Sequence, residues 1–206
     1  MKNVVKIRLT DRKRESILDA AVQEFGTSGF DNTSMDRIAE IANASKRTVY
    51  NHFPSKEELF AAIVDRLQSR CDSIQEYSFD PRKQLEPQLR KVIQTYVEMV
   101  NSEEFKDLAR IILPRFLQTP DLAKQLLGDR RPGEQSLVNW IKSAQLAGQL
   151  KKAEPVLIAR QLRGMLDTFA FWPQVLGSDP PLTKKQQSEL IRSTVRIILD
   201  HYGIPA

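Results

Sequence analysis

The spacing of apolar residues is the feature that most restricts how this 206-residue chain can fold. Apolar side chains recur every three or four positions, as in Ile17, Leu18, Ala21, Val22 and Phe25, which is the spacing of one face of a helix. No segment alternates convincingly between apolar and polar residues, and no Asn-Gly or Asp-Gly pair marks a hairpin turn. The sequence therefore predicts an all-α chain of about ten helices.

Capping residues and helix breakers divide this pattern into segments. Glycines within residues 26–29 should end the first helix, and Thr33 should cap a short second helix. Ser45 should cap a third helix, and Ser55 should open a long fourth one. The composition changes across residues 77–81, and cap signals predict six more helices beyond residue 85. We therefore expect an N-terminal unit followed by a larger C-terminal one.

Positive charge is concentrated at the N-terminus. The chain carries a net charge of +5. Residues 1–14 contain six basic residues and one acidic residue, and six minus one already equals that net charge. A basic arm on a nearly neutral body is typical of proteins that bind nucleic acids, although a charged and solvated tail would have the same composition.

The composition also excludes several classes of protein. No apolar run approaches the roughly 20 residues that cross a bilayer, and the first residues lack the apolar stretch of a signal peptide. Cys71 is the only cysteine, so it forms no internal disulfide. The chain has two histidines, and one cysteine and two histidines are too few for an ordinary structural zinc site. We expect a cytoplasmic protein with no metal, cofactor or membrane partner.

Residues 35–53 have the pattern of two helices joined by a tight turn. Ala39 supplies the small side chain that is needed where the helices touch, and Asn43 tolerates left-handed backbone at the turn. Val49 supplies a branched apolar side chain on the inner face of the second helix. This spacing is that of a helix-turn-helix, although periodicity alone also fits an ordinary surface helix of a bundle.

The exposed face of the second of these helices contains basic, amide and hydroxyl side chains and no acid. At 3.6 residues per turn this face comprises Lys46, Arg47, Thr48, Tyr50 and Asn51. Arginine can bridge guanine O6 and N7, and asparagine can bridge adenine N6 and N7, while hydroxyls and lysines suit phosphates. Together with the basic arm, this face favours DNA binding over a structural role.

Residues 12–60 resemble the DNA-binding domain of the tetracycline-repressor (TetR) family of bacterial regulators. The matching stretches are residues 17–21 with Phe25, Gly29-Phe30, Thr33, Ile38-Ala39, residues 45–53 and residues 55–59. The resemblance implies a three-helix, homeodomain-like head with a basic arm at residues 1–54. It also implies a connecting helix at residues 55–80 and a helical bundle for ligand binding and dimerisation at residues 81–206.

The resemblance also implies roles for single residues. Thr33 would cap the second helix and, like Thr48, Tyr50, His52 and Lys56, would contact phosphates, although His52 could instead pack beside its neighbour. The whole DNA-binding set is Thr33, Ser34, Lys46, Arg47, Thr48, Tyr50, Asn51, His52 and Lys56. Lys46 and Arg47 lie where family members vary, so they are the candidates for base reading. Asn43 departs from the family, which usually has glycine there.

Large apolar residues of the C-terminal part are the candidate ligand-binding residues. They are Tyr96, Met99, Phe105, Ile112, Phe116, Trp140, Phe169, Phe171 and Trp172. Pro114 should kink its helix and open room beside it, although an aromatic residue at helical spacing is more often part of the core. No charged residues converge, so the expected ligand is a small apolar or amphipathic molecule.

Two apolar stripes are the candidate dimer interface, as the resemblance implies for the last two long helices. They comprise Leu162, Met165, Leu166, Leu190, Ile191, Val195 and Ile198. Gly164 would let a partner backbone approach. The alternative is that both stripes fill the core of a single chain.

The resemblance implies a homodimeric repressor that a small effector releases from a palindromic double-stranded DNA operator. The sequence leaves open whether the protein activates transcription instead. No enzyme is expected, since the chain lacks a phosphate-binding glycine loop, a His-Glu metal pair and a cysteine with a convincing base. A DNA binder without sequence preference is disfavoured, because such binding depends on many phosphate contacts and the overall charge is low.

Overall fold

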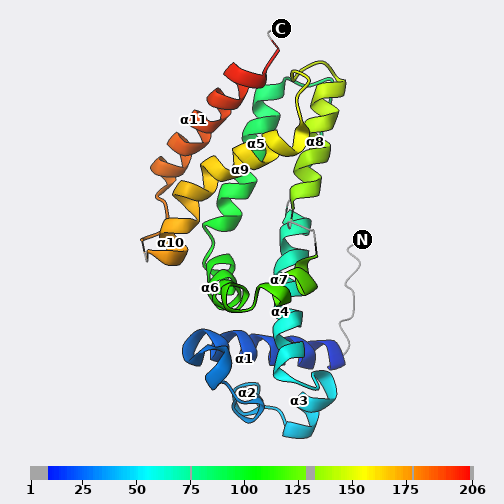
Figure 1. The fold of residues 1–206 in the computed structure, drawn as a ribbon, viewed down its shortest axis with the longest axis vertical. Coiled ribbons are helices and arrows are strands. Elements are labelled where there is room, and N and C mark those ends of the chain that lie inside the picture. Colours follow the sequence, from blue (N-terminus) through cyan, green and yellow to red (C-terminus); the bar gives the residue numbers. More distant parts are fainter. Residues whose placement is uncertain (1–8, 75, 129–132, 178, 205–206) are drawn as a thin grey trace. The chain divides into compact units, whose positions relative to one another are not determined.

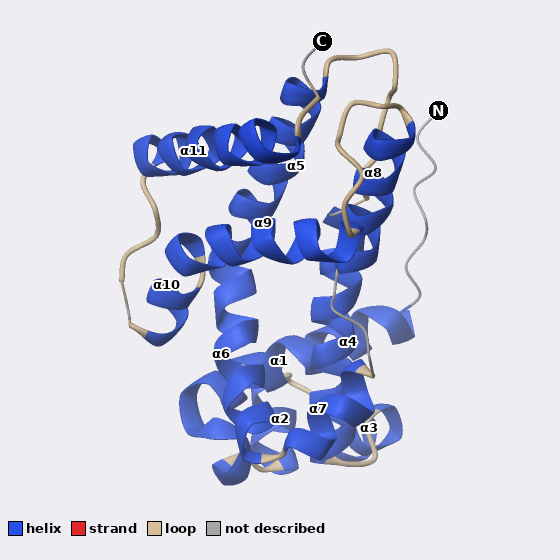
Figure 2. Cartoon of the chain, turned by 45° about the horizontal axis from the view of Figure 1, so that its top comes forward, coloured by secondary structure: helices blue, strands red, loops and turns tan. Residues whose placement is uncertain are grey.

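The computed structural model describes residues 9–74, 76–128, 133–177 and 179–204. Within these residues the chain forms eleven helices and no strand, which confirms the predicted all-α fold (Figure 1, Figure 2). The described residues divide into two compact units. The first unit runs to Arg66 and adds Asp107–Leu126, and the second takes Leu67–Lys106 and the described residues from Leu127 onward.

The first unit begins with three helices that pack in sequence, α1 with α2 and α2 with α3. They are α1 (Leu9–Asn32), α2 (Met35–Ile41) and α3 (Lys46–His52), and α4 (Lys56–Ile74) follows. The buried face of α1 contains four of the residues whose spacing predicted it. Ile17, Leu18, Ala21 and Phe25 are each at most 3% exposed. Helical periodicity thus identified the buried face of α1, apart from Val22, which is half-buried.

The end of α1 differs from the prediction. The helix does not stop at Gly26, and its backbone leaves helical geometry at Gly29 (φ 78°, ψ 163°). Thr33, the predicted cap of α2, is only 4% exposed and donates its hydroxyl hydrogen to the carbonyl oxygen of Gly29 at 2.8 Å. Ser34 caps α2 instead, because its side chain accepts from the backbone N–H of Arg37. Thr33 and Ser34 are adjacent residues that can both cap a helix. The Thr33 hydroxyl is bonded to Gly29 at the kink, so Ser34 is the residue that caps α2.

Two other predicted caps in this unit are confirmed. The Ser45 side chain accepts from the backbone N–H of Thr48 at 3.1 Å, and α3 begins one residue after Ser45. At the start of α4, the Ser55 side chain accepts from the backbone N–H of Glu58 at 3.2 Å. Both side chains satisfy N–H groups that have no partner within their own helix. They therefore fix where α3 and α4 begin.

Phenylalanine rings connect α1, α4 and α6 (Glu103–Gln118) within the first unit. The Phe30 ring centroid lies 5.3 Å from that of Phe25 and 5.5 Å from that of Phe60. Phe116 of α6 in turn lies 6.1 Å from Phe60, and the Arg115 guanidinium lies 4.5 Å from the Phe30 centroid. These contacts explain why α6 from Asp107 onward belongs to this unit, which no sequence pattern had predicted. The same unit includes most of α7 (Pro120–Leu127).

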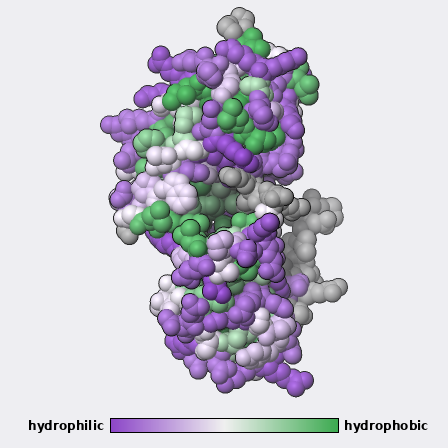
Figure 3. Space-filling model, in the orientation of Figure 1, coloured by the Kyte–Doolittle hydropathy of each residue, from purple (hydrophilic) through white to green (hydrophobic). Residues whose placement is uncertain are grey.

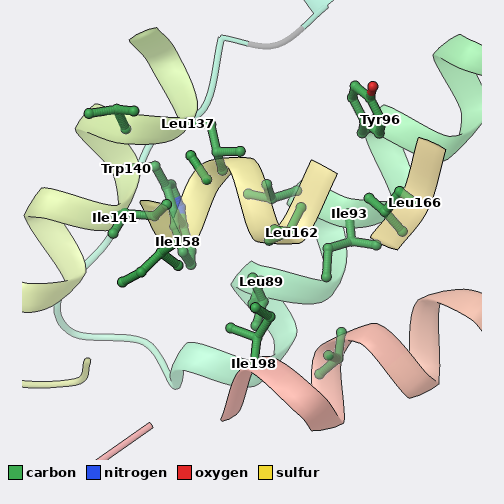
Figure 4. Packing of buried hydrophobic residues seen from close by; sticks show 14 of the residues in the cluster. Leu89, Ile93, Tyr96, Leu137, Trp140, Ile141, Ile158, Leu162, Leu166 and Ile198 are labelled. Carbon is green, nitrogen blue, oxygen red and sulfur yellow. The ribbon is translucent and has the colours of Figure 1, made fainter. Parts of the chain in front are cut away.

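The second unit is a helical bundle with one apolar core. Its helices are the last part of α4, the first part of α6, and α5 (Leu85–Val100), α8 (Glu134–Leu146), α9 (Pro155–Ala170), α10 (Trp172–Leu176) and α11 (Lys184–Tyr202). α11 packs against α5 and α9, and α8 packs against α9. Figure 4 shows core residues from four helices: Leu89 and Ile93 of α5, Trp140 of α8, Leu162 and Leu166 of α9, and Ile198 of α11. The apolar stripes of these helices meet inside this unit.

Seven described helices begin at or after residue 85, one more than predicted. The additional helix is the short α10, where a proline follows Trp172 within the first turn. Pro114 lies inside α6 and does not end it. The predicted capping box at the start of α11 is confirmed, since Thr183 and Gln186 exchange side-chain to backbone hydrogen bonds.

Two features of other protein classes do not occur in the described residues. None of the described helices combines the length and the apolar character of a membrane span. Nowhere in the same part of the chain do three Asp, Glu, His or Cys side chains gather as they would around a metal ion.

Candidate nucleic-acid interface

The turn between α2 and α3 has the predicted geometry. Asn43 adopts left-handed backbone with φ 47°, the conformation for which glycine or asparagine is needed. Ala39 on α2 is 3% exposed and Val49 on α3 is fully buried, so the inner faces of both helices are apolar. The backbone N–H of Ala44 donates to the carbonyl oxygen of Ala39 at 3.0 Å and closes the turn. Residues 35–53 therefore form the helix-turn-helix that their spacing predicted.

The outer face of α3 is exposed and polar. Arg47 and Asn51 are exposed, and Tyr50 is 48% exposed. Thr48 is half-buried, with its hydroxyl oxygen 2.7 Å from that of Ser45. His52 is half-buried too. The structure thus brings most of the predicted DNA-binding residues to one short helix and leaves four of them open to solvent, because Lys46 is exposed as well.

An acidic residue from α2 lies beside this face. The Lys46 ammonium group contacts the Asp36 carboxylate at 2.5 Å, and the hydrogen bond and charge of Asp36 raise the pKa of Lys46. Both side chains are more than half exposed, at 66% for Lys46 and 52% for Asp36. Considered alone, α3 presents no acid, but the assembled surface does. The pattern of residues along α3 alone gives no sign of Asp36, which comes from α2.

Lys56 is held within the first unit. Its ammonium group donates to the backbone carbonyl oxygens of Asp31 and Thr33, each at 3.1 Å, and lies 4.6 Å from the Phe30 ring centroid. The start of α4 is thereby tied to the junction between α1 and α2. A phosphate would have to compete with two charge-assisted hydrogen bonds for this ammonium group. The geometry is that of a residue that positions the helix-turn-helix.

The predicted ligand-binding residues do not come together as one set. Ile112 and Phe116 belong to the first unit, whereas the others belong to the second. Phe169 and Trp172 are 59% and 43% exposed, so they do not line an interior cavity. Met99 and Trp140 are buried core residues, and the Phe105 ring packs 5.8 Å from that of Phe171. The assignment of these residues to one pocket stays a prediction, because helical spacing does not identify the unit or the face that an aromatic residue occupies.

A polar cluster inside the second unit involves one of these residues. The Tyr96 hydroxyl of α5 donates to the Asp167 carboxylate of α9 at 2.5 Å, and the Arg163 guanidinium lies 4.9 Å from the Tyr96 ring centroid. Burial raises the pKa of both Tyr96 and Asp167. Arg163 also acts on Cys71, where it opposes the burial that raises the pKa of that thiol to about 11. Arg163 and Asp167 were not among the predicted site residues, although two opposite charges four positions apart in an apolar helix are a signal that the sequence contains.

Surface hollows occur in both units. One of about 840 Å³ lies at one end of the second unit, lined by residues 81–86, 148–149, 151, 199–200 and 203–204. Another of about 430 Å³ lies between α5 and α11, and one of about 460 Å³ lies on α1 beside the end of α2. None of these three is lined by the predicted ligand-binding residues.

The predicted dimer residues lie mainly inside the chain. Leu162, Leu166, Val195 and Ile198 are each at most 2% exposed, because they fill the core of the second unit. The assignment of these four to an interface is therefore wrong. Met165, Leu190 and Ile191 are partly buried and pack against the same core.

The outward faces of α9, α10 and α11 also contain apolar residues. Leu157, Phe169, Trp172, Leu176 and Ile197 are between 43% and 69% exposed. Figure 3 shows green side chains reaching the surface at the level of α10. Gly164 is exposed on α9, and a Cβ atom built there has no neighbour within 4 Å. These residues, which we call the outer apolar face, remain available for a partner.

A helix-turn-helix with an exposed polar reading helix, followed by a helical bundle, defines a DNA-binding transcriptional regulator. Comparison with known proteins agrees. Residues 17–63 match the model of the TetR family of bacterial regulatory proteins, and residues 87–204 match the C-terminal domain of AefR-like transcriptional repressors. The chain belongs to the TetR family of transcriptional regulators.

Three relatives illustrate this membership. The regulator RutR of Escherichia coli is 30% identical over 149 residues, which cover 68% of this chain and 67% of RutR. A TetR-family regulator from Pseudomonas syringae has a solved structure that is 42% identical, with a TM-score of 0.83 over 96% of this chain and all of that one. The flavonoid-responsive regulator FrrA is 29% identical, with a TM-score of 0.73 over 95% of this chain and 99% of FrrA.

Proposed function

We propose that this protein is a homodimeric repressor that binds a palindromic DNA operator and is released from it by a small effector. The observation that carries the proposal is the exposed face of α3, where Arg47, Tyr50 and Asn51 lie open to solvent on a helix-turn-helix. Such a protein acts where bacterial DNA is, in the cytoplasm.

The contacts with DNA divide into base reading and phosphate binding. We assign base reading to Arg47 and Asn51, whose side chains suit guanine and adenine edges in the major groove. Phosphate contacts fall to Ser34 at the start of α2 and to Tyr50 on α3, with Thr48 and His52 beside them. Thr33 contributes through its backbone at most, because its side chain is buried. Lys56 acts by positioning α4 against α1 and α2.

A second copy of the chain is the partner that the outer apolar face fits. A single head reads only one half-site, and a two-fold dimer places two heads on a palindrome. Leu157 and Phe169 of α9 and Ile197 of α11 supply exposed apolar area, and Gly164 leaves room for a close approach. The dimer therefore uses the outward faces of these helices, while their inward faces form the core.

The effector site of this proposal is the polar cluster of Tyr96, Arg163 and Asp167. Tyr96 is buried and the other two are half-buried, and polar groups of this kind orient a ligand in a mostly apolar site. A hydroxyl of a bound molecule could replace that of Tyr96 on Asp167, so a small amphipathic compound with a phenolic hydroxyl fits the cluster. The flavonoid-responsive relative FrrA supports an effector of this class.

Selection of DNA from a random duplex pool tests the central claim. The full-length protein should enrich a palindrome with two half-sites spaced by whole helical turns. Arg47→Ala should relax the preference at one base pair of each half-site, at a loss of about 1–3 kcal/mol for each bidentate contact. Enrichment of no sequence by the folded wild-type protein would refute operator binding.

A further inference from the structure

We propose that Asp36 determines base preference in the DNA-reading face, by presenting its carboxylate to an amino group on the edge of a base. The inference rests on the proposed binding of an operator. It starts from the observation that the exposed face of α3 is not free of acid once α2 is packed beside it. Asp36 reaches that face from the first turn of α2.

Asp36 and Lys46 form a bridge between the two helices of the motif. Asp36 lies two residues after the cap of α2, and Lys46 is the first residue of α3. Their charged groups are 2.5 Å apart, and both side chains are more than half exposed. An exposed pair of this kind adds little to stability, so contact with DNA can open it at small cost. The pair is therefore able to exchange partners.

A carboxylate on a DNA-reading face discriminates between base sequences. Phosphates and most base-edge acceptors repel it, whereas the N4 amino group of cytosine and the N6 amino group of adenine can donate to it. On DNA that places such an amino group opposite Asp36, the carboxylate gains a donor. Lys46 is then free to contact a phosphate or the acceptors of a guanine. On other DNA the pair stays closed, and neither charge contributes to binding.

The result is selectivity against wrong sequences rather than a gain in affinity for the right one. A charge that is repelled by every DNA sequence except the correct one lowers the affinity for the wrong sequences. The difference between the affinities for operator and for unrelated DNA then increases. Removing the negative charge should strengthen binding to unrelated DNA more than binding to the operator. It should also remove the base preference opposite Asp36.

Glu40 provides a matched control on the same helix. Its carboxylate is also exposed, at 68%, and pairs with the Arg37 guanidinium at 2.9 Å. Unlike Asp36, it forms this pair along its own helix and not with α3. Glu40→Gln therefore removes the same charge from α2 and leaves the hydrogen bond between Asp36 and Lys46 in place, so any effect that Glu40 has on Lys46 through its charge is measured separately.

The experiment compares full-length wild-type protein, Asp36→Asn and Glu40→Gln. Each protein selects from one random duplex pool, and anisotropy titrations then measure binding to the wild-type site and to a scrambled duplex of equal composition. Asp36→Asn should lose the preference for cytosine or adenine at one position of each half-site. Its affinity for scrambled DNA should rise about three- to fivefold per head, and the ratio of the two affinities should fall about tenfold. Glu40→Gln should select the wild-type site.

Two results would overturn the inference. The first is an unchanged preference at every position in Asp36→Asn, and the second is an equal rise in affinity for both duplexes, which would make Asp36 a general charge only. Failure of the wild-type protein to select any site would instead refute the proposed function. If thermal melting shows that Asp36→Asn is unfolded, Lys46→Gln decides. It should keep the preference opposite Asp36 and bind both duplexes more weakly, and loss of that preference would assign it to Lys46.

Discussion

Replacing Lys56 by methionine separates two roles for this residue. The family resemblance implies a phosphate contact, whereas the structure shows an ammonium group that donates to two backbone carbonyl oxygens and lies over the Phe30 ring. Methionine keeps most of the length of the side chain and removes the charge and the donors. A phosphate ligand and a positioning residue should respond to this change in opposite ways.

The expected loss of stability follows from these contacts. Hydrogen bonds that involve a charged group contribute about 1.5–3 kcal/mol each when buried, and an exposed cation over an aromatic ring contributes about 0.5–1 kcal/mol. Lys56 is half-buried, so solvent replaces part of each interaction when the side chain is lost. We expect the free energy of unfolding to fall by about 2 kcal/mol, which lowers the melting temperature by about 4–8 °C.

Urea unfolding followed by circular dichroism measures the free energy of unfolding. Operator binding at several salt concentrations measures the number of phosphate contacts through the salt slope. If Lys56 contacted a phosphate, the variant would lose one contact per head, which would lower the salt slope of the proposed dimer by about 1.8. We expect Lys56→Met to leave this slope unchanged. Lys124→Met is the matched control, because Lys124 is exposed in the last turn of α7. Unchanged stability together with a shallower salt slope would refute the positioning role.

Two further predictions concern the second unit. Because burial raises the pKa of Asp167, its protonated form stabilises the fold below the ordinary value of 3.8, and this contribution is lost as the pH rises through the higher folded-state pKa. Asp167→Asn should remove that part of the dependence of unfolding free energy on pH, and an unchanged dependence in urea titrations would contradict the cluster geometry. Phe169→Glu on the outer apolar face should shift the protein from dimer to monomer in sedimentation experiments. The control Leu117→Glu alters an exposed residue of α6 and should not do so, and equal effects of the two would move the interface elsewhere.

The helix-turn-helix was predictable because its constraints are local. The motif depends on three residues between positions 39 and 49. These are a small residue at 39, a residue tolerant of left-handed backbone at 43 and a branched residue at 49. The caps at Ser45 and Ser55 are equally local. Such features depend on backbone geometry over one or two helical turns, which a single sequence contains in full.

Contacts between distant residues were not predictable in the same way. Apolar periodicity showed that Leu162 and Leu166 are buried, but not whether they are buried against a partner or against their own chain. Lys56 meets carbonyl groups more than 20 positions away. Asp36 becomes part of the reading face only when α2 packs on α3. Each case needs the identity of the packing partner, which spacing along one helix does not contain.

The division of α6 between the two units suggests how an effector could act on DNA binding. The first residues of α6 belong to the second unit, while Arg115 and Phe116 contact Phe30 and Phe60 in the first. We predict that an effector bound in the second unit alters the contacts that α6 makes in the first unit. Reciprocity then requires operator DNA to weaken effector binding by the same factor, with each 1.4 kcal/mol of coupling equal to about tenfold.

Arg115→Met tests this route. The guanidinium lies over Phe30 and 3.8 Å from the Asp31 carboxylate, and its loss should leave operator affinity without effector within about threefold of wild type. The factor by which an effector weakens operator binding should fall up to about fivefold, since the lost contacts contribute about 1 kcal/mol. A phenolic compound that raises the melting temperature of the wild-type protein serves as the effector, and Lys124→Met again serves as the control. If Arg115→Met is released from the operator as readily as wild type, α6 does not transmit the signal through this contact.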